Sequence, residues 1–320
     1  MWKVKLLTTI RYLDFNVPSG SYEFMPGVIL IVGAKNVSDY IGSDFRRYAG
    51  EIEYSHFQRA SNIVVGEFDH AAWGDDATAS EILFCWLVWI EWILQDSWLV
   101  YDSSIHSEIA FAKKSEKNKS VEWSNNNLAS HASDSYGGRL TVTTISLNDL
   151  EQWIERSLKL RTYIHDRGVT IATPVISKSY TRFARFINFV QLARRTSHPA
   201  MKIAQMCSAL ESLFSTDTSE LTHRLSERVA MFLGGDGEAM EKSYQMMKKC
   251  YAVRSQITHG SHIKDSVAEQ IPDMSFDMMV MLREIALKII DSPELSKLFD
   301  GDNDGIEAYF RRLLFGIART

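Results

Sequence analysis

Short apolar runs separated by turn residues mark the first 75 residues of the chain. The runs are rich in β-branched and aromatic side chains, and Gly, Pro and Asn stand between them, as in VPSGSYEFMPG and VILIVGAKN. This pattern is typical of short strands and predicts four or so of them. A further strand is predicted at RLTVTTISL, residues 139–147. Asn148 followed by Glu151 then forms a capping-box pattern, which predicts that a helix begins there.

Two segments between these strands differ sharply in polarity. Residues 78–99 have the pattern of one helix, and the stretch 82–94 (ILFCWLVWIEWIL) is apolar except for Glu91. A membrane-spanning helix needs about 20 such residues, so the pattern favours a buried core helix over a membrane segment. Residues 113–138 are polar and rich in Lys, Ser and Asn, and we expect a long surface loop there.

Beyond Pro174 the apolar positions repeat with helical periodicity almost to the end of the chain. Gly234, Gly235 and Gly260 act as stop signals. The predicted helices cover residues 179–195, 199–214, 219–233, 238–259, 275–291 and 304–318. The expected fold class is therefore α+β. A β-containing domain of unassigned family is expected over residues 1–150, and an all-α helical bundle over residues 151–320.

Composition adds the broad class. The 320 residues are 45% hydrophobic and 23% charged, which is typical of a folded globular chain. The net charge of −5 gives no overall attraction to nucleic acid, so any such binding needs a local basic patch. Three cysteines without a CxxC pair, and an amino terminus without a signal-peptide pattern, lead us to expect a cytoplasmic protein with no membrane partner.

Common catalytic and metal-binding signatures are absent from the sequence. It contains no GxSxG, Walker or GxGxxG motif. The acidic loop 300–305 matches the start of a calcium loop, but the twelfth position is Arg311, so we expect Asp304 to cap the last helix instead. His259 and His262, with Asp265 nearby, could be metal ligands, yet no further donors follow at a suitable spacing. No metal and no cofactor are therefore predicted.

The helix predicted at 238–259 carries an unusual charge on its apolar stripe. The stripe runs through Met240, Tyr244, Met247 and Tyr251, and the next position on it is Arg254. A guanidinium there needs an anionic partner, which can be a carboxylate such as Glu211 or a phosphate.

The same helix ends in a histidine. His259 lies five residues after Arg254, at the helix end, where an imidazole can hold and release a proton near neutral pH. Five residues turn an ideal helix by about 140°, so the two side chains diverge unless the last turn distorts or a second protomer faces the first. This spacing indicates a cleft formed by a dimer.

These residues carry a family resemblance. The stretch from Tyr251 to Gly260, YAVRSQITHG, resembles the Arg-x4-6-His signature of HEPN domains, in particular the Apea-like HEPN family. The segments MCSALESLF (206–214) and LTHRLSERVAMFL (221–233) resemble the two helices that precede this signature in the family. The similarity covers roughly residues 175–295 and does not reach the first 150.

The resemblance implies a helical bundle that dimerises and cleaves RNA without metal. In that chemistry the ribose 2′-OH attacks the adjacent phosphodiester and leaves a 2′,3′-cyclic phosphate. Carried over to this sequence, His259 would be the general acid/base, Arg254 would stabilise the phosphate charge and Ser255 would orient the pair. Supporting roles would fall to Glu211, Tyr251 and Thr258.

A basic stretch lies next to this region. Residues 156–195 include nine basic residues and one acidic residue. A patch of such charge can bind along a phosphate backbone. Lys178, Arg182 and Arg185 share one predicted helix face. Together with Arg194 and Arg195 they are the predicted RNA contacts, although the same face could simply be solvated.

Three function classes follow from these features. The first is a metal-independent endoribonuclease, acting as a homodimer on RNA. The resemblance suggests a prokaryotic toxin or phage-defence effector for it. The second is a non-catalytic HEPN module that binds RNA or a protein, with Arg254 serving only an ion pair. The third is a metal-dependent hydrolase that uses His259 and His262.

Overall fold

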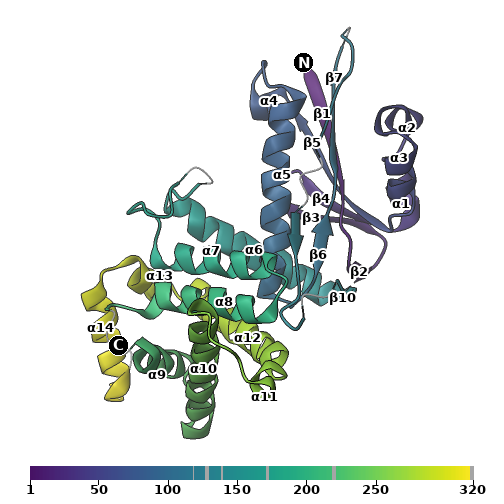
Figure 1. Ribbon diagram of the computed structural model, residues 1–320. Helices are drawn as coiled ribbons and strands as arrows, with labels where there is room; N and C mark the ends of the chain where they lie inside the picture. Colours follow the sequence, from purple (N-terminus) through teal and green to yellow (C-terminus); the bar gives the residue numbers. More distant parts are fainter. Residues whose placement is uncertain (118, 127–129, 138–139, 171–172, 218–220, 318–320) are drawn as a thin grey trace. The chain divides into compact units, whose positions relative to one another are not determined.

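The computed structural model describes residues 1–117, 119–126, 130–137, 140–170, 173–217 and 221–317. The chain divides into two compact units (Figure 1). The first comprises Met1–Ala132 and Leu140–Leu158, and the second comprises Ser133–Arg139 and Lys159–Thr320. The chain enters the second unit at Ser133, returns to the first at Leu140 and leaves it again after Leu158, inside a helix, whereas the sequence led us to expect one boundary at residue 150. A sheet in the first unit and helices throughout the second confirm the α+β class.

An antiparallel six-stranded sheet forms the first unit, in the order β3-β4-β5-β1-β7-β8. The strands are β1 (Trp2–Thr9), β3 (Gly20–Met25), β4 (Val28–Val32), β5 (Asn62–Asp69), β7 (Ala110–Glu116) and β8 (Glu122–Asn126). Two small ladders join β2 (Leu13–Asn16) to β10 (Thr143–Ser146), and β6 (Ile105–Ser107) to β9 (Ser130–Ala132). The strands predicted before residue 75 are confirmed.

The surface loop predicted at 113–138 is wrong, because β8, β9 and the end of β7 lie there. Lys113 pairs with Trp123, and Ala110 pairs with Asn126, in a hairpin at the edge of the sheet. An edge strand tolerates polar side chains because its backbone hydrogen bonds hold it in the sheet and part of its surface faces water. The composition of the segment therefore concealed its structure.

Opposite faces of this sheet are covered by different helices (Figure 1). On one face lies α5 (Ala79–Asp96), followed by a short 3-10 turn, Ser97–Leu99. The helix begins in a capping box between Thr78 and Glu81. It approaches the sheet at Gly66, where an added Cβ would lie 2.6 Å from the Trp86 ring. The other face carries α1 (Ala34–Ser38), α2 (Ser43–Ala49) and α3 (Glu51–Gln58), and α4 (His70–Trp73) follows β5.

By length and composition, the segment Ala79–Leu99 could cross a membrane, and it alone among the described helices has this property. In this structure 67% of its apolar window is buried. Ile82, Trp86, Ile90 and Leu94 pack into the core beneath the sheet. The prediction of a buried core helix is therefore confirmed.

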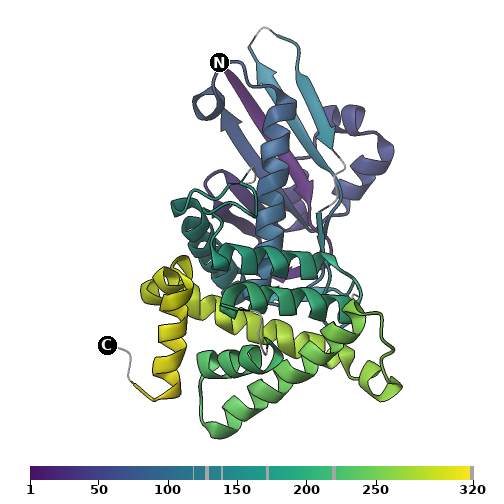
Figure 2. The same cartoon turned by 60° about the vertical axis from the view of Figure 1, so that its left-hand side comes forward.

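The second unit is a bundle of helices. These are the end of α6 (Leu147–Asp166), α7 (Arg182–Arg195), α8 (Pro199–Phe214), α9 (Leu221–Leu233), α10 (Gly237–Thr258), α11 (Asp265–Ala268), α12 (Ile271–Ile290), α13 (Pro293–Asp300) and α14 (Asn303–Leu314). Helix α8 packs against α7, α9, α10 and α12, so it forms the core of the bundle (Figure 2). All six predicted helices are present, whereas α11 and α13 were not predicted.

Capping residues explain the boundaries that differ from prediction. Helix α7 begins at Arg182 because the Thr181 side chain accepts the Ala184 N–H. Helix α6 begins earlier than predicted because Ser146 and Asp149, rather than Asn148 and Glu151, exchange the capping hydrogen bonds. The last helix is capped by Asp302, which accepts the Gly305 N–H, and not by Asp304.

Candidate functional site

The predicted catalytic residues lie at the carboxyl end of α10. This helix ends at Thr258, and His259 is its cap. The Ser261 N–H closes the end by donating to the Gln256 carbonyl at 2.8 Å. Gly260 has a φ of +68°, a left-handed conformation that glycine adopts without strain. The sequence HG therefore fixes the point at which the helix stops and the side chain of His259 emerges.

Arg254 lies on the inner side of α10, as its place on the apolar stripe predicts. Its Nη2 atom is 3.4 Å from Oε1 of Glu211 on α8, and its guanidinium lies 5.2 Å from the centre of the Tyr251 ring. The Arg254 side chain remains 24% exposed. The structure thus brings Arg254, Glu211 and Tyr251 together.

The Glu211 carboxylate is incompletely satisfied. Its Oε1 atom is buried and accepts no hydrogen bond from any residue that the structure describes, so the 3.4 Å contact with Arg254 is an ion pair without hydrogen-bond geometry. Burial and the hydrogen bond to Glu211 raise the pKa of Tyr251 to about 12, so this phenol keeps its proton at neutral pH. A buried carboxylate oxygen without a donor is uncommon in folded proteins, and what it needs is a hydrogen-bond donor rather than a second anion.

The remaining residues of the signature lie nearer the solvent. His259 is exposed, and its backbone N–H donates to the Ser255 carbonyl at 3.0 Å. The exposed Thr258 uses its hydroxyl to donate to the Arg254 carbonyl at 2.8 Å, while Ser255 is half-buried. Within the described residues, no hydrogen bond or ion pair joins the side chains of Arg254 and His259. This separation agrees with the divergence expected from their spacing.

The basic stretch does not form a single surface. Lys178 and Arg195 are exposed, and Arg185 is half-buried, with Nε 3.4 Å from the Val175 carbonyl. Arg194 is fully buried in α7, so the prediction that it contacts RNA is wrong. Its position on the last turn of an amphipathic helix did not reveal which way it faces.

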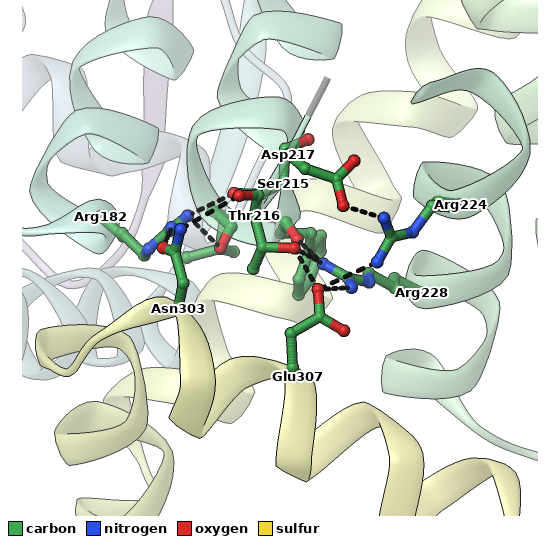
Figure 3. Close-up of polar contacts among 10 residues, drawn as sticks. Arg182, Ser215, Thr216, Asp217, Arg224, Arg228, Asn303 and Glu307 are labelled. Carbon is green, nitrogen blue, oxygen red and sulfur yellow. Dashed lines mark hydrogen bonds and ion pairs between the residues drawn. The ribbon is translucent and has the colours of Figure 1, made fainter. Parts of the chain in front are cut away.

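Arg182 is also not available as a predicted RNA contact, because its guanidinium is bonded within the protein. Its Nη1 atom donates to the carbonyls of Ser215 at 2.8 Å and Ser212 at 3.2 Å, at the end of α8, and its Nη2 donates to Asn303 (Figure 3). Burial, with the charges of Arg185 and Arg228, lowers the pKa of Arg182. The guanidinium therefore caps the carbonyl end of a neighbouring helix.

A second arginine network adjoins this one and was not predicted. Arg224 and Arg228, one turn apart on α9, both donate to Oε1 of Glu307 on α14, at 2.9 and 2.5 Å (Figure 3). Thr216 donates to the same carboxylate, and Arg228 also donates to the Phe214 carbonyl at 2.5 Å. The cavity beside these groups measures about 10 Å³, room for about one water. The charged groups of this network are paired with one another, although Glu307 remains 39% exposed.

Comparisons with protein-family models, curated proteins and solved structures find no match for this chain. The HEPN resemblance thus stays a prediction that rests on residues 206–260.

No metal centre is evident in the part of the chain that the structure describes, since no three His, Cys, Asp or Glu side chains gather there as metal ligands. In the calcium-like loop, Asp300 accepts hydrogen bonds from Tyr163 and Arg167, and Asp302 caps α14. These carboxylates already have protein partners.

Proposed function

We propose that the second unit is a metal-independent endoribonuclease of the HEPN type that works as a homodimer. One observation carries the proposal. The guanidinium of Arg254 lies beside Glu211 and Tyr251 but stays a quarter exposed, and its 3.4 Å contact with Glu211 lacks hydrogen-bond geometry. A positioned and partly open guanidinium is suited to an incoming phosphate.

The proposed chemistry needs one cation and one proton carrier. Arg254 would neutralise the charge that grows on the nonbridging phosphate oxygens as the ribose 2′-OH attacks phosphorus. His259, exposed at the helix end, would take the 2′-OH proton, and the resulting imidazolium or a water would protonate the departing 5′-oxygen. The P–O5′ bond breaks as the new P–O2′ bond forms, which gives a 2′,3′-cyclic phosphate and a 5′-hydroxyl. Glu211 and Tyr251 would act as positioning residues.

Cleavage of labelled RNA by the full chain in EDTA tests this proposal. We expect Arg254→Ala and His259→Ala each to slow cleavage at least about a hundredfold, while the melting temperature falls by no more than about 4 °C. His262→Ala is the matched control, since this exposed histidine lies only three residues further on and should leave the rate unchanged. Unchanged cleavage in His259→Ala, or products without cyclic phosphate, would contradict the proposal.

Mixing two inactive variants tests the dimer. If each site combines Arg254 of one copy with His259 of the other, a heterodimer of Arg254→Ala and His259→Ala contains one intact site. Random exchange then restores about a quarter of the wild-type activity. A site contained within one protomer gives no recovery after exchange.

The ion pair between Arg254 and Glu211 favours a second candidate, a non-catalytic module that binds RNA or a protein. Glu211→Gln separates the two. In the enzyme it should lower the cleavage rate about tenfold by releasing Arg254 from its position, with RNA affinity little changed. A non-catalytic module shows no cleavage in either form, and its RNA affinity would then be the property to follow.

A further inference from the structure

The sheet of the first unit has one face that helices cover only in part. The strand registers place Lys5, Glu67, Lys113 and Trp123 in a single row across β1, β5, β7 and β8. The neighbouring row, with Leu7, Val65 and Phe111, is apolar and packs beneath α2 and α3. The charged row therefore begins where the helical cover stops.

A cavity of about 200 Å³ opens along this border. Its floor is formed by Leu7, Phe45 and Phe111, which are all buried, and Tyr40 and Trp123 also line it. A second hollow of about 340 Å³, which includes Lys3 and Asp69, shares Lys5 and Glu67 with the first. Together the two hollows reach the size range of small-ligand sites, roughly 300–1,000 Å³.

The aromatic wall of the cavity is built from rings that pack on one another. The Trp123 ring stacks on Tyr48 with their centres 4.6 Å apart and their planes inclined by 16°. Lys113 Nζ lies 5.4 Å from the centre of the same indole, and Phe45 meets Phe111 edge to face at 4.9 Å. Such a packed aromatic surface is suited to a flat ring, since little side-chain entropy is lost when the ring binds.

The charged rim presents two cations whose present partners are weak competitors. Lys5 pairs with Glu67 at 3.0 Å, with both side chains more than half exposed, and Lys113 pairs with Asp44, which is half exposed. Exposed ion pairs are worth about 1 kcal/mol or less, so an anionic group can displace Glu67 from Lys5. Lys113 is 30% exposed, and its remaining N–H donors can meet the same anion beside Asp44. Both carboxylates would then accept hydrogen bonds from hydroxyl or amino groups of the same ligand.

We propose that this cavity binds a free nucleoside monophosphate. The ligand has to combine a flat ring for the aromatic wall, an anion for Lys5 and Lys113, and hydrogen-bond donors for the three acids of the lining, Asp39, Asp44 and Glu67. A nucleotide supplies all three in its base, phosphate and ribose, whereas an aromatic carboxylate without hydroxyl or amino groups lacks the donors. The site lies wholly in the first unit and does not depend on the proposed ribonuclease function.

Calorimetric titration of the full chain tests this binding site. We expect at least one of AMP, GMP, CMP and UMP to bind with a dissociation constant below about 1 mM, and the matching nucleoside or inorganic phosphate to bind at least about tenfold more weakly. Lys113→Ala should weaken nucleotide binding about tenfold or more. Lys119→Ala is the matched control, since Lys119 also pairs with an acid at the β7–β8 turn but does not line the cavity.

Several outcomes would overturn the proposal. These are the absence of binding by all four nucleotides at about 1 mM, or equal affinity in Lys113→Ala and Lys119→Ala. Binding of short 5′-phosphorylated RNA without binding of free nucleotides would also overturn it, because the site would then recognise the ends of RNA chains.

Trp123→Phe, which keeps an aromatic wall, should weaken binding less than Trp123→Ala. If both leave it unchanged, the cavity is not the site. If Arg254→Ala loses RNA cleavage, its affinity for nucleotides should still equal that of the wild type.

Discussion

Two arginines on helices that pack against α8, Arg228 on α9 and Arg254 on α10, show how one residue type serves different roles. Arg228 is only 6% exposed, and its guanidinium donates at 2.5 Å to both the Phe214 carbonyl and Glu307. Arg254 is 24% exposed and has one carboxylate contact, at 3.4 Å, without hydrogen-bond geometry. The guanidinium of Arg228 makes hydrogen bonds to three protein groups, the Phe214 carbonyl, Thr216 and Glu307, while that of Arg254 makes none within the described residues. Hydrogen-bond satisfaction, rather than charge or burial alone, separates a structural arginine from one that can meet a phosphate.

The comparison predicts opposite consequences for stability. Arg228→Ala should lower the free energy of unfolding by about 3 kcal/mol, because it removes a buried charge and leaves a carbonyl of α8 without its donor. Arg254→Ala should cost about 1 kcal/mol or less, since its single ion pair is partly solvated. Urea unfolding of both variants at pH 7, with equal m-values, measures the difference. If both variants lose the same free energy of unfolding, Arg254 is a structural residue like Arg228 and the contrast between them fails.

The sequence predicts local structure in this chain better than it predicts partners. Pro199 and an unbroken apolar periodicity predict α8 with both ends correct, and the stripe that ends in Arg254 indicates an inward-facing guanidinium that meets Glu211. The Arg228 network joins residues 79 positions apart, and no local pattern links them. The fully buried Lys202 is similar: its ammonium donates to Ser133 and to the Ala193 carbonyl, both at 3.0 Å, a pairing that only the folded chain creates.

Acid should weaken the network of Arg224, Arg228 and Glu307 in a defined pH range. Burial alone would raise the pKa of Glu307, but hydrogen bonds from Thr216 and Arg228, with the charges of Arg228 and Arg224, outweigh it and hold that pKa below its usual value. The pKa of Glu307 is thus lower in the folded protein than in the unfolded chain, where it is about 4.3. The carboxylate therefore stabilises the fold above about pH 4.3, and this stabilisation is lost as the pH falls through the pKa of the folded state.

Glu307→Gln should therefore be less stable than wild type by about 1 kcal/mol at pH 7, and the gap should close below about pH 4. Thermal unfolding between pH 7 and pH 3 measures it. Glu284→Gln is the control, since Glu284 forms only an exposed pair with Lys288 and should show a small gap at every pH. A gap that stays constant in Glu307→Gln would mean that the network does not depend on the carboxylate charge.

The smallest effect expected concerns the basic residues that remain on the surface. Lys178→Ala and Arg195→Ala remove exposed side chains, so each should change stability by less than about 0.5 kcal/mol. If these residues contact phosphates, each change should reduce the salt dependence of RNA binding by about 0.7 in the slope of log K against log salt. Binding is measured in the His259→Ala background to prevent cleavage. Lys297→Ala, an exposed change on α13 outside the basic stretch, should leave the slope unchanged. An equal slope in all three variants would restrict RNA contact to the end of α10 and sharpen the contrast between Arg254 and the arginines that the fold has already used.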